Sequence, residues 1–152
     1  MRIGVVGHAR DKLTPETEHK AREIIRGILL AAEKPVVAVS GHSPLGGVDL
    51  ILEEVALELG IPTDIKAPKD HSWDGEYGFK ARNLDIARDS DEVHVIVVKE
   101  YPPGYTGRRF ASCYHCAKMP GNDPKSHCKS GACFTAMQAK RMGKRAIWHI
   151  IE

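Results

Sequence analysis

The chain has 152 residues, of which 42% are hydrophobic and 28% charged, with a formal net charge of +2. This length suits one domain with its own core, here spanning residues 1–152, and the near-neutral charge argues against a dedicated nucleic-acid binder. The first apolar run contains Gly4 and Gly7 and is unlike a secretory signal, and no apolar run is long enough to span a bilayer. We therefore expect a cytoplasmic domain without membrane contact.

Five short apolar segments predict β-strands. In chain order they are Arg2–Val6, Val36–Val39, Pro62–Lys66, Glu92–Val98 and Ala146–Ile150. The fourth is rich in valine and isoleucine, which is typical of a strand buried on both faces. Segments with helical periodicity alternate with these strands. The pattern therefore predicts an α/β fold, doubly wound, in which helices cover both faces of a mostly parallel five-stranded sheet.

Four helices are expected between the strands. The first begins at Thr14-Pro15-Glu16, which offers an N-cap, a proline at the first helical position and an acid in the first turn. The second ends at Gly60, a residue type that favours helix termination. The third covers Phe79–Ala87, and the fourth covers Ala132–Met142.

The stretch Lys99–Ser130 fits neither a strand nor a helix, and it contains four prolines and three glycines. A loop this long inside a compact domain is usually functional, disordered or held by a local cross-link. All four cysteines of the chain lie in it or directly after it, with the spacing Cys113-x2-Cys116-x11-Cys128-x4-Cys133. We therefore expect a cysteine-rich loop at about residues 99–131 that is fastened by its thiols.

Two close pairs of thiols separated by a short loop suit tetrahedral coordination of zinc by Cys113, Cys116, Cys128 and Cys133. A site of four thiolates leaves no coordination position open, which favours a structural over a catalytic zinc ion. Three alternatives remain open. His115 or His127 could replace one cysteine, the thiols could stay reduced and free, or they could form two disulfides.

The residues that follow the predicted strands are candidates for a ligand site, because ligands of open parallel sheets bind outside the carboxyl ends of the strands. Gly7-His8-Ala9-Arg10 follows the first strand, and a glycine-rich turn, Ser40–Gly47, follows the second. Gly46 and Gly47 stand at an expected helix start, where free N–H groups and the helix dipole favour an anion. The alternative is that these glycines only make a tight turn.

Several segments together resemble the SLOG superfamily, which includes DprA/SMF proteins, LONELY GUY proteins and the small YspA-like proteins. They are Ser40-Gly41-His42-Ser43-Pro44-Leu45-Gly46-Gly47-Val48-Asp49, Ala81-Arg82-Asn83, Ser90-Asp91 and the final helix led by Ser130-Gly131. The likeness is greatest to the YspA-like group and covers most of the chain. It implies a Rossmann-like fold that binds a nucleotide or nucleotide-derived ligand, with Arg82 or Asn83 near that ligand. It also implies self-association, which is common among relatives.

The strand ends and the resemblance together define a candidate ligand site at the carboxyl edge of the sheet. Its residues are Gly7, His8, Arg10, Ser40, Gly41, His42, Gly46, Gly47, Asp49, Arg82, Asn83, Ser130 and Gly131. Trp73 and Tyr77 are candidates for stacking on a base, although packing over the sheet edge would equally explain them. We expect a nucleotide-like small molecule as the partner.

Two other functions remain open, so the sequence does not decide whether the chain is an enzyme. The first is hydrolysis of an N-glycosidic or phosphate bond of a nucleotide. LONELY GUY enzymes use a Pro-Gly-Gly-x-Gly-Thr-x-x-Glu motif with a catalytic glutamate, and the matching segment Lys129–Thr135 has no acid at that point. Asp49 or Asp74 would then have to assist cleavage. The second is a DNA-associated module like the DprA group, which the near-neutral charge disfavours.

Overall fold

The computed structural model describes residues 1–152 and contains one five-stranded sheet with the strand order β3-β2-β1-β4-β5. The strands are β1 (Arg2–Gly7), β2 (Val37–Ser40), β3 (Thr63–Ile65), β4 (Glu92–Val98) and β5 (Arg145–Ile151). Every neighbouring pair is parallel. The doubly wound α/β fold is thus confirmed, and each strand lies within two residues of its predicted bounds.

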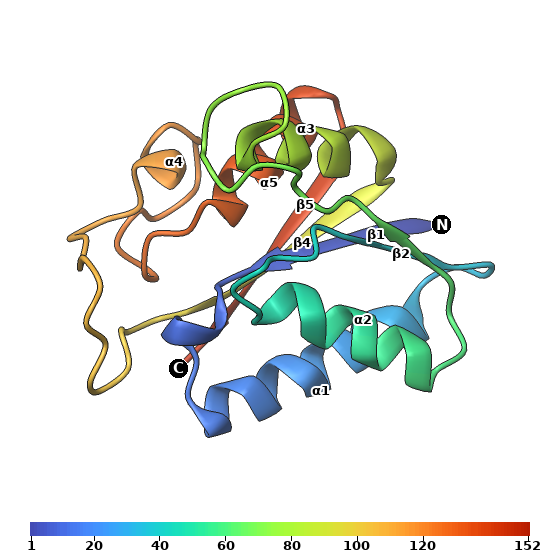
Figure 1. Cartoon of the computed structure of the whole chain (residues 1–152), viewed down its shortest axis with the longest axis horizontal. Helices are drawn as coiled ribbons and strands as arrows, with labels where there is room; N and C mark the ends of the chain where they lie inside the picture. The colour runs from blue at the N-terminus through green and yellow to red at the C-terminus, as the bar shows by residue number, and fades with distance from the viewer.

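Helices cover both faces of the sheet, as Figure 1 shows. α1 (Pro15–Ala31) and α2 (Val48–Glu58) lie on one face, and α3 (Phe79–Asp89) and α5 (Ala132–Arg141) lie on the other. The predicted cap of α1 is present, since the Thr14 hydroxyl accepts the backbone N–H of Thr17 at 3.1 Å. No helix is both long and apolar enough to cross a membrane.

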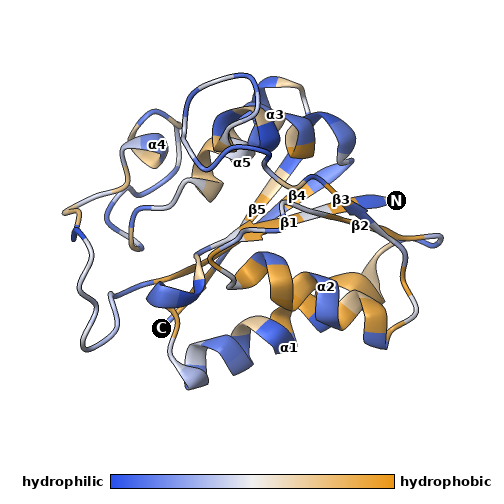
Figure 2. Ribbon diagram, viewed as in Figure 1, coloured by the Kyte–Doolittle hydropathy of each residue, from blue (hydrophilic) through white to orange (hydrophobic).

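Two apolar layers hold the fold together, one on each side of the sheet. Ile25 and Leu29 of α1 pack with Leu52 of α2 in the first layer, and Ile86 of α3 packs with Phe134 of α5 in the second. Figure 2 shows the central strands and much of α2 as hydrophobic, with hydrophilic residues on the outer parts of the helices. The periodicity of these segments therefore reflects burial against the sheet.

The order of the strands places a crevice between β1 and β4. The chain runs outward from β1 through β2 to β3, and then returns to the other side of β1 to form β4 and β5. Connections on either side of this point leave in opposite directions, so the carboxyl ends of β1 and β4 flank the position where such folds bind ligands. The segment 99–131 lies at the same edge, beyond the ends of the strands (Figure 1).

Two short helices were not predicted. η1 (Arg10–Lys12) is a 3-10 turn that begins three residues after β1 ends, and α4 (Tyr114–Ala117) is a single turn of helix inside the cysteine-rich segment. Helices this short bury too few residues to produce a detectable period. The rest of the segment between β4 and α5 is irregular, as expected.

Gly47 sets how closely the start of α2 approaches the end of β1. Its φ is +92°, in the region that favours glycine, and a Cβ there would collide with the carbonyl oxygen of His8. The same carbonyl accepts the N–H of Val48 at 3.1 Å. The glycine is therefore required for packing, whatever else this turn does.

Replacing Gly47 with alanine should lower the free energy of unfolding by at least about 2 kcal/mol, because the variant combines a strained backbone with a steric clash. Chemical denaturation measures this change. Gly27→Ala is the matched control, since Gly27 lies in α1 with no atom within 4 Å of its added Cβ. That variant should be neutral or more stable by up to about 1 kcal/mol. Equal stabilities of the two variants would show that Gly47 is not required for packing.

Candidate ligand cleft and metal site

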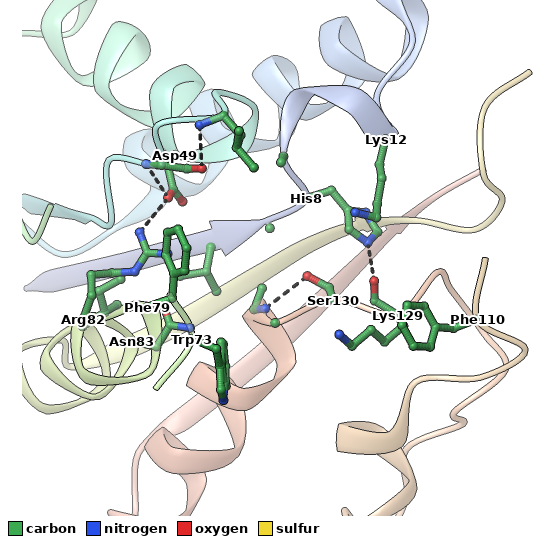
Figure 3. A pocket seen from close by; sticks show the side chains of 18 of the residues that line it. His8, Lys12, Asp49, Trp73, Phe79, Arg82, Asn83, Phe110, Lys129 and Ser130 are labelled. Atoms are coloured by element: carbon green, nitrogen blue, oxygen red, sulfur yellow. Dashed lines mark hydrogen bonds and ion pairs between the residues drawn. The ribbon is translucent and has the colours of Figure 1, made fainter. Parts of the chain in front are cut away.

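A cleft of about 420 Å³ opens at the carboxyl end of β1, where Val6 and Gly7 line it. Seven of the residues predicted for the ligand site line it, namely Gly7, His8, Asp49, Arg82, Asn83, Ser130 and Gly131. They come from the end of β1, from α2 and α3, and from the start of α5, segments far apart in the sequence. Figure 3 shows Asp49 and Arg82 on one side of the cleft and His8, Lys12 and Lys129 on the other.

The other predicted residues do not line the cleft. They are Arg10, Ser40, Gly41, His42, Gly46 and Gly47. Glu53 of α2 holds part of the glycine-rich turn, because it accepts a hydrogen bond from Ser40 Oγ at 2.7 Å and lies 2.8 Å from His42 Nδ1. Ser40 and His42 are thus engaged in the packing of the turn itself, while Ser43 and Leu45 of the same turn line the cleft.

Asp49 and Arg82 form a buried ion pair at one end of the cleft. The Asp49 carboxylate lies 3.4 Å from Arg82 Nη1 and accepts the backbone N–H of Ser43 at 3.1 Å. Burial raises the pKa of Asp49 to about 6, although the Arg82 charge opposes this shift. Arg82 also donates to the carbonyl of Gly41, while its buried Nε has no partner. This guanidinium therefore keeps one donor free.

Three further cations line the opposite end of the cleft, and each lies over an aromatic ring. Arg108 is 4.7 Å and Lys129 is 4.8 Å from the ring centroid of Phe110. Lys12 lies 5.4 Å from the centroid of Tyr105. Asp49 is the one acidic residue in the lining, so the four cations leave an excess of positive charge. This end of the cleft therefore favours an anion.

Aromatic side chains also form the side wall of the cleft nearer to α3. Trp73 and Phe79 both line it, and the Trp73 ring meets Phe134 edge-on at 5.4 Å between centroids. The Arg82 guanidinium carbon lies 5.3 Å from the centroid of Phe79. Of the two aromatic residues proposed from the sequence, Trp73 reaches the cleft and Tyr77 does not.

Sequence reasoning missed most of the basic and aromatic lining. The missed residues are Lys12, Phe79, Tyr105, Arg108, Phe110 and Lys129. Four of them lie in the irregular segment, where no periodicity marks which side chains face inward. The one available signal was the pair Arg108 and Arg109, which stands between Tyr105 and Phe110.

His8 connects the end of the sheet to the cysteine-rich segment. Its Nδ1 accepts the N–H of Val98 at 3.1 Å, and its Nε2 lies 3.2 Å from the carbonyl of Cys128 and 3.3 Å from that of Lys129. This arrangement requires a neutral ring with its proton on Nε2. Burial is the main cause that lowers the pKa of His8 to about 3, and the Lys12 charge adds to it.

Cys113, Cys116, His127 and Cys133 form a buried cluster that can bind a metal ion, with their ligand atoms all within 4.8 Å of one another. His127 Nε2 lies 3.4 Å from the sulfur of Cys133 and 3.7 Å from that of Cys116. A tetrahedral zinc site separates neighbouring nitrogen and sulfur ligands by about 3.6 Å. The spacing therefore fits a four-coordinate metal.

The predicted set of four cysteine ligands is corrected at one position. His127 stands in the cluster, and the neighbouring Cys128 lies outside it. The Cys128 sulfur lies 3.6 Å from the carbonyl of Lys99, and burial raises the pKa of this thiol to about 11. Cys128 is thus a buried, protonated thiol. The chain has no disulfide, since all four cysteines are free.

Hydrogen-bond donors surround the ligand atoms of the cluster. The Trp148 indole N–H lies 3.5 Å from the Cys133 sulfur, and the Asn122 amide lies 3.6 Å from the Cys116 sulfur. Ser126 Oγ lies 2.9 Å from His127 Nδ1 and leaves Nε2 facing the sulfurs. Such outer partners orient metal ligands and stabilise thiolate charge.

The thiols and the imidazole of the cluster shift one another's pKa values in opposite directions. Hydrogen bonds from Cys116 and Cys133 hold the pKa of Cys113 far below its ordinary value. Burial by itself would lower the pKa of His127, but hydrogen bonds with the Cys113 and Cys116 sulfurs raise it to about 9. The same contacts raise the pKa of Cys133, so the ligand atoms of the cluster share protons among themselves. A metal ion would displace those protons when it binds.

Comparisons of the chain with protein-family models, with curated proteins and with solved structures found no match. The resemblance to the SLOG superfamily consequently stays a prediction.

His8→Leu should lower the free energy of unfolding by about 2 to 3 kcal/mol, because it leaves the Val98 N–H and the Cys128 carbonyl buried without partners. His8→Gln should cost less, since a carboxamide can replace both hydrogen bonds. Chemical denaturation at about pH 7.5 measures both effects.

The pH dependence of the free energy of unfolding distinguishes the contribution of His8 from that of other acid-sensitive groups. Because its pKa is lowered in the folded state, its contribution is complete above about pH 6.5 and is lost as the pH falls toward 3. Between pH 7.5 and 5, the wild type should lose about 2 kcal/mol more than His8→Gln. If the stabilities of the wild type and His8→Gln changed equally with pH, His8 would not be held neutral in the folded state.

Proposed function

We propose that this protein binds a nucleotide or a nucleotide-derived ligand in the cleft at the carboxyl end of β1. The balance of charge carries the proposal, because Lys12, Arg82, Arg108 and Lys129 face a single carboxylate, Asp49. The cleft volume of about 420 Å³ suits a small molecule better than a DNA strand. Binding without turnover, as in a sensor, accounts for every one of these features.

The phosphate belongs at the end of the cleft formed by Lys12, Arg108 and Lys129. Ser130 and Gly131 lead into α5 beside this end, so the positive end of a ten-residue helix dipole adds to the cationic side chains. A phosphate at the start of α2 is less favourable, because the Asp49 carboxylate already accepts the Ser43 N–H there. The base would then stack near Trp73 and Phe79.

A second candidate function is cleavage of the N-glycosidic bond of the bound nucleotide, and one observation favours it. Asp49 is the carboxyl group in the cleft, and its pKa of about 6 allows it to exchange a proton near neutral pH. Asp74, the other carboxylate considered from the sequence, does not line the cleft.

We also propose that the metal of the Cys113, Cys116, His127 and Cys133 cluster is a structural zinc ion. Three thiolates and one imidazole match a common zinc ligand set, and four protein ligands leave no position for a substrate. The thiolate-rich, buried environment disfavours magnesium and calcium, which prefer oxygen ligands.

Protein purified without added metal should contain about one equivalent of zinc per chain when measured by elemental analysis. Cys116→Ser and His127→Ala should abolish this content, because each removes one of four ligands. Cys128→Ser is the matched control and should keep the zinc, since that thiol lies outside the cluster. If Cys128→Ser lost the zinc and His127→Ala kept it, the fourth ligand would be Cys128, as the sequence predicted.

The zinc-loaded protein should bind ADP in isothermal titration calorimetry, and Lys129→Ala or Arg108→Ala should weaken binding by about tenfold or more, because each removes a charged partner of the phosphate. Lys125→Ala is the control, since this exposed lysine of the same segment does not line the cleft. Equal losses in all three variants would indicate general electrostatics, and no ADP binding would overturn the proposal.

The same preparations decide between binding and cleavage. Incubation with AMP should release no free adenine if the protein is a binder. Release of adenine that stops in Asp49→Asn would instead establish the glycosidase function.

A further inference from the structure

We infer that metal occupancy of the Cys113, Cys116, His127 and Cys133 cluster controls the affinity of the cleft for its anionic ligand. The inference rests on the proposed function, because the ligand is the one proposed for the cleft. It adds an energetic coupling between the metal cluster and the cleft. The two sites bind different ligands, but the same chain segment supports both.

The segment that carries the cluster also carries the anion-binding end of the cleft. Phe110, which lies beneath Arg108 and Lys129, precedes the ligand Cys113 by three residues. Lys129, Ser130 and Gly131 all lie between the ligands His127 and Cys133. Fixing the ligand residues around an ion therefore fixes the chain that positions this phosphate-binding end.

The aromatic wall of the cleft rests on the same cluster. The Trp73 ring lies 6.4 Å from the ring of His115, between Cys113 and Cys116, and 5.4 Å from that of Phe134, next to Cys133. A Cβ on Gly131 would lie 3.5 Å from the Trp73 ring, so Trp73 also covers the start of α5. Movement of the cluster would displace this wall.

The segment has few other means of keeping its position. The hydrogen bonds of residues 100–126 all stay inside residues 99–131, and α4 is a single short turn. Polar connections to the sheet lie at its two ends, from Lys99 to Ile151 and from Cys128 to Val98 and His8. The middle of the segment therefore depends on apolar packing and on the cluster.

The coupling has to be reciprocal, because binding free energies at two linked sites change by the same amount. If zinc raises the affinity for the anionic ligand by some factor, the ligand must raise the affinity for zinc by that factor. This equality distinguishes a real coupling from damage caused by stripping the metal.

The experiment measures ADP and inorganic pyrophosphate affinities for the zinc-loaded and the zinc-stripped protein, and the equilibrium zinc affinity in competition with a chelator, with and without ADP. We expect ADP to bind at least about tenfold more weakly to the stripped protein, within the usual range of such couplings. ADP should tighten zinc binding by an equal factor. Cys128→Ser should keep the full coupling, and Cys116→Ser should bind ADP as weakly as the stripped wild type at every zinc concentration.

Hydrogen exchange shows whether the sheet survives removal of the metal. Loss of protection confined to residues 99–131 and the neighbourhood of Trp73, with β1 and β4 still protected, supports the inference. Equal ADP affinity of the loaded and stripped proteins overturns it, as does unfolding of the whole sheet. If the zinc-loaded protein binds neither ADP nor pyrophosphate, the proposed function fails. In that case hydrogen exchange still tests the metal separately, because exchange around the cleft that does not change when zinc is removed would refute control by the metal.

Discussion

The segment between β4 and α5 must stay ordered almost without regular secondary structure, and the contacts that order it shape the whole site. Fixing a backbone residue costs roughly 1 to 2 kcal/mol in conformational entropy, and residues 99–131 recover little of this through helix or strand hydrogen bonds. Burial of Cys113, Cys116, His127 and Cys133 in one cluster offsets part of that cost. The neutral ring of His8 fastens the returning end of the segment to the sheet. Cleft and cluster consequently depend on the same few contacts.

The two ends of the cleft differ in their electrostatics. At one end, Asp49 neutralises most of the charge of Arg82, and the pair is buried. At the other end, Lys129 and Arg108 lie over the face of Phe110, which holds two cations close together without an acidic partner. Cation–π contacts position a charge without cancelling it. The cleft is therefore asymmetric, with a cationic end at Lys129 and Arg108 and an aromatic wall at Trp73 and Phe79.

The glycine-rich turn shows how one sequence pattern can serve two physical purposes. Glycines before a helix allow a phosphate to approach the backbone, and they equally allow another part of the chain to do so. Here the carbonyl of His8 makes that approach to Gly47, and Glu53 engages Ser40 and His42. The sequence contains every one of these residues, but their pairing depends on how α2 packs against β1. The sequence therefore predicted seven of the residues that line the cleft, and the structure places the other six candidates outside its lining.

The sequence by itself determined the order of the elements, the doubly wound sheet, the edge that carries the cleft and the grouping of three cysteines. Periodicity records how each segment is buried, and burial against a sheet is a local property of a helix or strand. The tertiary structure decided that His127 and not its neighbour Cys128 joins the cluster, because the fold of the irregular chain turns one side chain inward and the other toward Lys99. It also brought together Lys12, Trp73 and Lys129 from three distant segments. Contacts between irregular segments leave no period in the sequence, so only the folded chain reveals them.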